Sequence, residues 1–465
     1  MAALSDAAQQ AFSLFDDDSS DEESPVQMNT APVVVPPPAP AVAAAPVVVE
    51  DRSSIEKPAS RTHELYAPWE DVRPKYVGPV ELVTNCNGIG GMRGYVAAED
   101  LSAGTLLLIE EVFVPWPQDM EQSDPEFFIA TLETIFQRED IDHVMKHMAH
   151  LHPQRLSDLP MELLEAGHAK YDENLAKLAE RHPASGFTCD QLLQAVFAMQ
   201  CNAFDSGVFL FNAMFNHDCN PNCIKFTPED VAPGLSEVRL AKSVKKGEAL
   251  TISYLYPREQ TRSRRQRNLR EQFGFVCICE LCRRGDSILV RPPTQPTEGD
   301  EEEGGDDAKT MDEVEEVVFM AENLFKADQS ATNAAQVLGI ALESLSDALE
   351  IVAHDHLVLI RIHKLVADCC DVLLKGKPKQ DVPEYAILFL RSSYELLELQ
   401  RTFLNDDHMD LARTLNDVSQ GIQLLLSYDP KVLLEEFPEW TDFRQASIVE
   451  NQYRQEYRRL KKLYE

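Results

Sequence analysis

Three cysteines stand within six residues in the middle of the chain. Cys277, Cys279 and Cys282 form a C-x-C-x2-C cluster. Structural zinc takes four tetrahedral nitrogen or sulfur ligands, and a loop with this spacing supplies three of them. The fourth ligand must come from elsewhere, and Cys219 and Cys223 are the obvious donors. The spacing therefore predicts a zinc ion that joins two segments far apart in the sequence, because ordinary buried thiols are seldom so crowded.

The composition narrows the class of protein. The 465 residues leave room for two or three domains. The 43 basic and 78 acidic side chains give a net charge of −35, which gives no indication of a nucleic-acid-binding face. Many of the acidic side chains lie in two runs, at 16–23 and 298–316, and we expect both runs to be exposed to solvent.

The sequence also indicates the cellular compartment of the protein. No apolar run approaches the roughly 20 residues that a membrane span needs. The first ten residues, MAALSDAAQQ, lack the basic and apolar regions of a signal peptide. Ten cysteines in this setting indicate metal binding in a reducing compartment rather than disulfides. We therefore expect an intracellular protein of the nucleus, the cytoplasm or both.

Changes in composition and periodicity divide the chain into segments with different expected structures. Glycine turns and short apolar strands indicate a β-rich region, and long amphipathic stretches indicate helices. The predicted segments are a disordered acidic and Pro/Ala/Val-rich tail at 1–75, a β-rich domain at 76–258 with a helical insertion at about 120–200, a zinc-binding segment at 259–290, an acidic disordered linker at 291–311 and a helical domain at 312–465.

The helical domain carries a weak internal repeat with an offset of 52 residues. Asp355-His356 matches Asp407-His408, and several positions after each pair match as well. Such a repeat is typical of stacked helical pairs of the tetratricopeptide (TPR) kind. The alternative is a plain helical bundle.

Two other clusters have an ordinary explanation as well as a functional one. His143 and His147 are one helical turn apart and could bind a metal, but no neighbouring acidic or thiol ligand completes a set. We therefore expect polar helix residues. The arginines of 258–270 crowd a predicted helix, for which a solvated face is the first interpretation and a basic rim that steers acidic substrates is the second.

Three segments, taken in order, resemble the catalytic half of a SET-domain protein-lysine methyltransferase. They are NHDCNPNC at 216–223, GEALTISY at 247–254 and the cysteine cluster at 277–282. The closest likeness is to the SET and MYND (SMYD-type) branch. A weaker likeness joins MRGYVA at 92–97 to the family's glycine turn. The SMYD-type zinc finger needs about seven cysteines, and none lies between Cys86 and Cys189, so we expect the MYND module to be absent.

The resemblance implies a fold and a set of site residues. It implies an α+β fold, in which a β-rich SET domain with a helical insertion and a cysteine-rich zinc site precedes an all-α TPR-like domain. It makes Cys219 the fourth zinc ligand and leaves Cys223 as a packed thiol. It places Tyr254 at the methyl-transfer centre, with Phe204 lining the lysine channel beside it. The residues that it implies for binding S-adenosylmethionine are Arg93, Gly94, Tyr95, Asn216, His217 and Phe275.

The function that the resemblance implies is methyl transfer from S-adenosylmethionine to lysine side chains of protein substrates, histone or non-histone. The alternative is a catalytically idle SET scaffold whose helical domain binds partner proteins. Retention of Asn216, His217 and Tyr254 together favours activity, because a binding module does not need that trio. Neither interpretation involves direct binding to nucleic acid or membrane.

Overall fold

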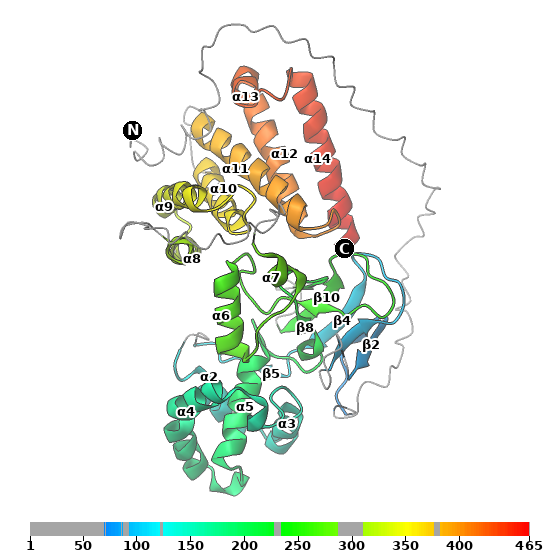
Figure 1. Cartoon of the computed structure of the whole chain (residues 1–465), viewed down its shortest axis with the longest axis vertical. Coiled ribbons are helices and arrows are strands. Elements are labelled where there is room, and N and C mark those ends of the chain that lie inside the picture. The colour runs from blue at the N-terminus through cyan, green and yellow to red at the C-terminus, as the bar shows by residue number, and fades with distance from the viewer. Residues whose placement is uncertain are drawn as a thin grey trace, which may run out of the picture.

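A computed structural model describes residues 69, 71–84, 86, 93–120, 124–226, 234–286, 310–375 and 382–464. The predicted disordered tail up to residue 68 and almost all of the predicted acidic linker lie outside the described residues, as does the glycine turn up to residue 92. The described chain has small β-sheets first and an all-helical region afterwards (Figure 1), which confirms the predicted α+β class.

The largest sheet has four antiparallel strands in the order β1-β4-β10-β9. Every second residue of β10 is buried, as expected for a strand with one face on the core. Its buried face includes Val238 and Leu240. The strands are β1 (Tyr76–Val77), β4 (Leu106–Glu111), β9 (Cys223–Phe226) and β10 (Leu235–Leu240).

Three smaller sheets surround the largest one. One is an antiparallel pair, one is a three-stranded antiparallel sheet in the order β5-β7-β6, and the third is a parallel pair. The antiparallel pair is β2 (Val80–Val83) with β3 (Gly94–Ala97), the three-stranded sheet contains β5 (Val114–Pro115), β6 (Ala203–Phe204) and β7 (Gly207–Val208), and the parallel pair is β8 (Asn216–His217) with β11 (Thr251–Ile252).

A helical layer lies at one end of the sheets, at the bottom of Figure 1. Its last helix begins at a capping box, because the Thr188 side chain accepts from the N–H of Gln191 and the Gln191 side chain accepts from the N–H of Thr188. That helix is buried along most of its length. The helices of this layer are α2 (Phe127–Phe136), α3 (Ile141–Met148), α4 (Met161–Arg181) and α5 (Cys189–Cys201).

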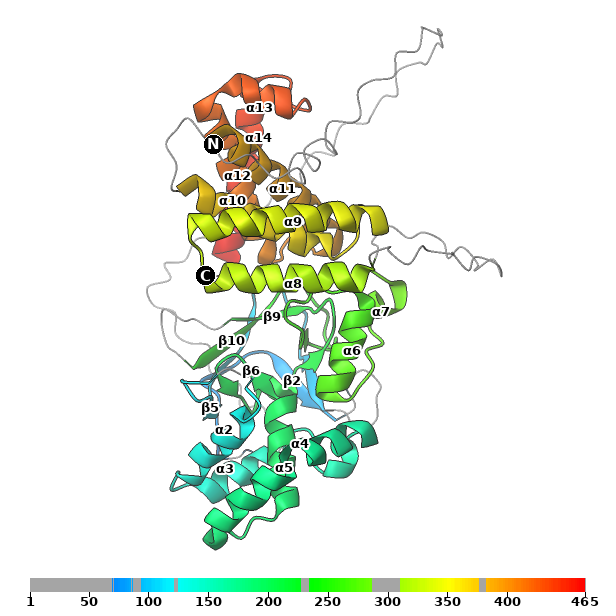
Figure 2. The same cartoon turned by 90° about the vertical axis from the view of Figure 1, so that its left-hand side faces the viewer.

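Two helices flank the cysteine cluster, and seven described helices form the C-terminal tail above the sheets (Figures 1 and 2). The flanking helices are α6 (Arg262–Phe273) and α7 (Glu280–Arg284). The tail helices are α8 (Met311–Ala327), α9 (Ala331–Ile351), α10 (Leu359–Lys375), α11 (Val382–Phe403), α12 (Asp410–Tyr428), α13 (Pro430–Glu436) and α14 (Phe443–Tyr464).

The two copies of the Asp-His repeat have the same local structure. The Nδ1 atom of His356 accepts from the N–H of Val358 at 3.2 Å, just before α10. The Nδ1 atom of His408 accepts from the N–H of Asp410 at 3.2 Å, at the start of α12. The 52-residue offset therefore corresponds to equivalent helix starts, which supports the repeat interpretation.

The helical tail packs on the sheet region. One hydrophobic cluster includes Leu255 and Leu269 from the sheet side and Val314 from α8. Asn405 Nδ2 donates to the carbonyl of Ala241 at 3.1 Å. The cysteine cluster, α6 and the tail therefore share a core, while the buried strand residues belong to a separate hydrophobic cluster. Within the described residues, no helix is both long and apolar enough to span a membrane.

One side chain of the acidic run at 298–316 contradicts the expectation of a solvated stretch. Glu315 is completely buried on α8. Its carboxylate accepts from Arg361 at 3.0 Å and from the Thr261 hydroxyl at 2.8 Å. Two hydrogen-bonding partners offset the cost of burying this charge. Glu315 therefore anchors α8 to the segment before α6 instead of extending the linker.

Candidate active site and metal cluster

The site is organised by the parallel pair β8 and β11, in which Thr251 lies beside Asn216 and Ile252 beside His217. The buried Asn222 side chain fastens the loop after β8 to this pair. Its Nδ2 donates to the carbonyl of Ala249 at 2.7 Å, and its Oδ1 accepts from the N–H of Thr251 at 2.8 Å. Sequence reasoning gave Asn222 no role, although an amide with both ends satisfied commonly supports such a loop.

The Asn216 side chain contacts the residue just before β3, the strand that follows the glycine turn. Its Nδ2 donates to the carbonyl of Arg93 at 3.0 Å. A Cβ atom at Gly94 would lie 2.2 Å from that same Nδ2, so only glycine permits this approach. The next residue, Tyr95, is fully buried with its ring 4.7 Å from that of Phe215. The structure thus brings Arg93, Gly94, Tyr95 and Asn216 together.

Tyr254 follows β11 and contacts the end of β8 twice. Its backbone N–H donates to His217 Nδ1 at 3.0 Å, and its hydroxyl donates to the carbonyl of Phe215 at 2.8 Å. Burial raises the pKa of the Tyr254 phenol well above its usual range. The phenol therefore stays protonated at neutral pH and acts as a hydrogen-bond donor rather than as a base.

Half-buried aromatic rings surround Tyr254. The ring of Phe273 lies 5.1 Å from that of Tyr254. Phe275 lies 6.4 Å from Tyr254 and 6.0 Å from His217, measured between ring centroids. His217, Tyr254 and Phe275, which are far apart in sequence, therefore form one partly exposed aromatic surface.

Phe204, the expected wall of the lysine channel, lies on β6 in the three-stranded sheet. Its ring packs edge-on against Phe209 at 5.6 Å. The Nζ atom of Lys225 lies 5.0 Å from the centroid of the Phe204 ring. This ring face therefore already accommodates an ammonium group within the molecule, by a cation–π contact.

Four cysteines converge on one side of Tyr254. The sulfurs of Cys219, Cys277, Cys279 and Cys282 all lie within 4.8 Å of one another. Cys219 lies 3.5 Å from Cys282 and 3.9 Å from Cys277. Cys223 is not in this group and contacts the Asn222 side chain instead. Four thiols at this separation suit a single tetrahedral zinc ion.

His217 contacts both the cysteine cluster and Tyr254. His217 Nε2 lies 3.2 Å from Cys219 Sγ, while its Nδ1 accepts from the N–H of Tyr254. Both ring nitrogens of His217 are therefore engaged inside the protein. The imidazole fixes the position of Tyr254 relative to the cysteines.

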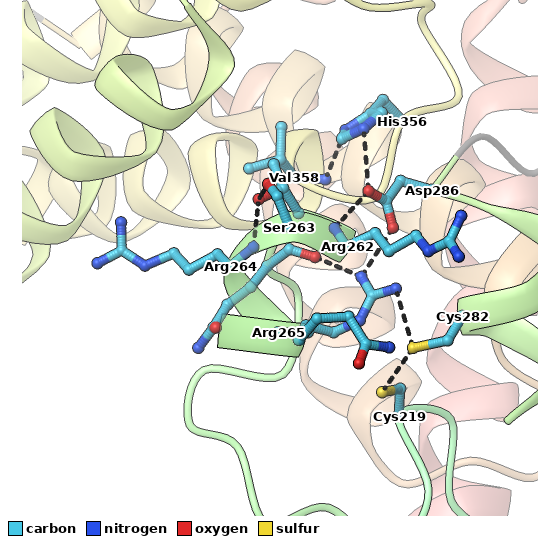
Figure 3. A network of polar contacts seen from close by, with 12 residues as sticks. Cys219, Arg262, Ser263, Arg264, Arg265, Cys282, Asp286, His356 and Val358 are labelled. Carbon is cyan, nitrogen blue, oxygen red and sulfur yellow. Dashed lines mark hydrogen bonds and ion pairs between the residues drawn. The ribbon is translucent and has the colours of Figure 1, made fainter. Parts of the chain in front are cut away.

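Arg265 lies beside Cys282 of the cysteine cluster (Figure 3) and is completely buried. Its guanidinium lies 3.8 Å from Cys282 Sγ and donates to Asp286 at 2.8 Å. Asp286 lies 3.9 Å from His356 of the helical tail. The prediction that these arginines are exposed to solvent is therefore wrong for Arg265. Its positive charge is buried between the carboxylate of Asp286 and the thiol of Cys282.

Glu110 is a second buried charge that sequence reasoning missed. The backbone N–H groups of Leu210, Phe211 and Asn212 all donate to its carboxylate, the shortest at 2.8 Å. Burial raises the pKa of Glu110 from its ordinary 4.5 to about 7, although these bonds act in the opposite direction. It fixes the segment that leads into β8. A glutamate that ends the apolar run LLLIE was the available signal.

A family model described as "SET domain" matches residues 92–255. The match contains the segments around Arg93, Asn216, His217 and Tyr254, and it ends before the cysteine cluster.

Three curated relatives each match about a quarter or less of this chain. A histone-lysine N-methyltransferase SET5 of Scheffersomyces stipitis is 34% identical over 110 residues, which are 23% of this chain and 22% of that protein. The human protein-lysine N-trimethyltransferase SMYD5 is 37% identical over 98 residues, 20% of this chain and 23% of that protein. A histone-lysine N-methyltransferase ASHR2 of Arabidopsis thaliana is 35% identical over 80 residues, 17% and 20% of the two chains. The aligned parts thus span about a quarter or less of these three relatives.

Proposed function

We propose, from the premise that this chain is a SET-domain protein, that it transfers methyl groups from S-adenosylmethionine to lysine side chains of protein substrates. The observation that carries the proposal is the position of Tyr254, held at one end by His217 of β8 and at the other by Phe215, just before β8. Its N–H is bonded to His217 and its hydroxyl to the carbonyl of Phe215. The printed names of the relatives, which include histone-lysine and protein-lysine methyltransferases, support the same reaction.

The chemistry of the site fits this cofactor. We propose that its amino-acid end lies near Arg93, Gly94 and Asn216, where amide and carbonyl groups gather around the close approach of two strands. We propose that the half-buried ring of Phe275 stacks near the adenine. His217 contributes its backbone, because both nitrogens of its ring have partners inside the protein.

S-adenosylmethionine supplies a methyl group that its sulfonium already activates. The protein therefore has to position a neutral lysine amine in line with that methyl group. A free lysine has a pKa near 10.4, so a site that excludes water favours the neutral form that attacks. The rings of Tyr254, Phe273 and Phe275 supply an apolar surface on which the bound substrate and cofactor would complete such a site. We propose that Phe204 guides the lysine, since its ring face suits an ammonium group.

The Tyr254 hydroxyl acts as a positioned donor and dipole at the transfer centre. Its raised pKa excludes a role as a general base near neutral pH. The amine must therefore lose its proton to solvent before or during binding. The phenol and the Phe215 carbonyl then set the orientation of the groups around the methyl group.

We propose that Cys219, Cys277, Cys279 and Cys282 bind one zinc ion that holds the aromatic surface in place. The segment from Phe275 to Cys282 has little regular structure apart from α7, so a metal supplies the constraint that packing does not. Cys219 is two residues after His217, and Phe275 is two residues before Cys277. The metal therefore fixes both sides of the proposed adenine site.

The proposal is tested by incubating the purified chain with methyl-labelled S-adenosylmethionine and a proteome extract or a histone mixture. We expect label in protein, and lysine methylation in mass spectra of the labelled bands. A well-folded chain that binds the cofactor but labels nothing in either mixture contradicts the proposed activity and favours a scaffold.

A further inference from the structure

We propose that Asp71, His143 and His147 form a second divalent-metal site, remote in sequence from the cysteines and of different ligand chemistry. His143 and His147 lie on α3, and Asp71 comes from the segment before β1. The two imidazoles alone do not make a complete set of metal ligands. The structure supplies the carboxylate from a residue 72 positions before His143.

The three side chains already converge. One ligand atom from each lies within 4.8 Å of the other two. Asp71 Oδ1 lies 2.9 Å from His147 Nε2, and Asp71 Oδ2 lies 3.4 Å from His143 Nδ1. The imidazole centroids are 4.2 Å apart. Ligands of a tetrahedral zinc ion are separated by about 3.4 Å when each bond is about 2.1 Å, so small side-chain rotations complete the site.

The ligand set selects a class of metal. Two imidazoles and one carboxylate suit zinc and similar borderline divalent ions, with water as the remaining ligand. Histidines one helical turn apart are a recurrent zinc-binding arrangement. His147 is fully buried and its ring stacks on Phe113, which fixes its orientation.

An ion can reach this site from solvent. The Asp71 side chain is 53% exposed and that of His143 is 39% exposed. Both side chains therefore offer their ligand atoms to an ion that approaches from outside.

A metal here would fix the start of the described chain to α3. Trp69 Nε1 donates to the carbonyl of His147 at 3.4 Å. The guanidinium of Arg93 lies 5.9 Å from the Trp69 ring and donates to the carbonyl of His150, just after α3. Arg93 in turn accepts from Asn216 through its carbonyl. The ion would thus stiffen one support of the strand that carries the proposed cofactor-binding residues, a consequence that rests on the proposed function.

The test counts metal ions in the full chain. Protein is equilibrated with buffered free zinc at a micromolar level, freed of unbound metal, and analysed for zinc per chain. We expect two zinc ions in the wild type and one in His143→Gln. Because His143 is partly exposed, we expect this variant to fold, and Asp71→Asn, which keeps the shape of the side chain, gives a second measurement.

His168→Gln is the matched control. His168 on α4 pairs with Asp172 at 3.0 Å and is as exposed as His143, but no second histidine joins it in the clusters of possible metal ligands found among the described residues. It should retain two zinc ions. Cobalt titration separates the two sites further, because thiolate ligands give charge-transfer absorption that nitrogen and oxygen ligands do not. One zinc in the wild type, or two in both His143→Gln and Asp71→Asn, would overturn the proposal and leave Asp71 as a hydrogen-bond partner of the two histidines.

Discussion

Arg265→Met removes the buried guanidinium between the cysteine cluster and the helical tail while keeping a long apolar side chain. The wild-type group lies 3.8 Å from Cys282 Sγ and donates to Asp286 at 2.8 Å and to the Gln260 carbonyl at 2.5 Å. After the substitution, Asp286 is only 13% exposed and has lost its cation. We expect both zinc affinity and stability to fall.

The size of the effect follows from these contacts. Breaking one side of a buried ion pair costs about 3–5 kcal/mol. Asp286 still accepts from the backbone N–H of Arg262, so we expect the lower end of that range, about 3 kcal/mol. Loss of a group that supports metal ligands commonly weakens metal binding about 10–100-fold. Arg265, a cation beside the four cysteines, is a supporting group of this kind.

Two assays measure these quantities. Competition with a chromogenic chelator gives the relative zinc affinity, and urea unfolding monitored by fluorescence gives the stability. Arg267→Met on the same helix is the control, because Arg267 is 48% exposed and pairs with Asp312 at 3.4 Å. We expect that variant to stay within about 0.5 kcal/mol of wild type. If Arg265→Met holds zinc as tightly as Arg267→Met and unfolds at the same urea concentration, the argument for Arg265 is wrong.

Two further predictions concern metal and pH. Removal of zinc with a chelator should abolish S-adenosylmethionine binding in calorimetry and lower the melting temperature, because Phe275 and His217 then lose their common support. If a zinc-free chain binds the cofactor as well as the zinc-loaded chain, the metal does not support the cofactor site. Glu110, whose pKa rises from 4.5 to about 7 on folding, binds more protons when folded, so its contribution to stability is present below pH 4.5 and is lost as the pH rises to about 7. As the pH rises from 4.5 to about 7, the free energy of unfolding of the wild type should therefore fall relative to that of Glu110→Gln. If the free energies of unfolding of the two proteins change with pH in the same way, this prediction is wrong.

Several features were predictable because short motifs carry them. The C-x-C-x2-C spacing indicated a metal site, and the resemblance chose Cys219 over Cys223, the same four cysteines that the structure brings together. The resemblance implied an α+β fold, and the described residues confirm that class. The Asp-His repeat indicated stacked helical pairs, and the structure places His356 and His408 at equivalent helix starts.

The missed features depend on long-range contacts. Asp71 lies far in sequence from His143 and His147, so no local pattern joins it to them. Arg265 stands among exposed and half-buried arginines of one helix, and only the fold distinguishes the fully buried one. Glu110 ends an apolar strand, where a carboxylate first suggests exposure. In each case the partner comes from another element, and local periodicity carries no information about it.

The central claim is that Tyr254 acts in methyl transfer rather than in packing. Tyr254→Phe keeps the ring against Phe273 and Phe275 and removes only the hydroxyl that donates to Phe215 at 2.8 Å. The lost hydrogen bond costs about 0.5–1.5 kcal/mol of stability. Loss of a positioned polar group at a reacting centre commonly lowers the rate about 10²–10³-fold.

The decisive measurement is single-turnover transfer of labelled methyl from saturating S-adenosylmethionine by wild type and Tyr254→Phe, with cofactor affinity measured by calorimetry on the same samples. Tyr256→Phe, at an exposed tyrosine two residues away, is the control and should behave as wild type. We predict that Tyr254→Phe binds the cofactor normally and transfers methyl at least about 100-fold more slowly. Transfer by Tyr254→Phe at the wild-type rate would contradict the account.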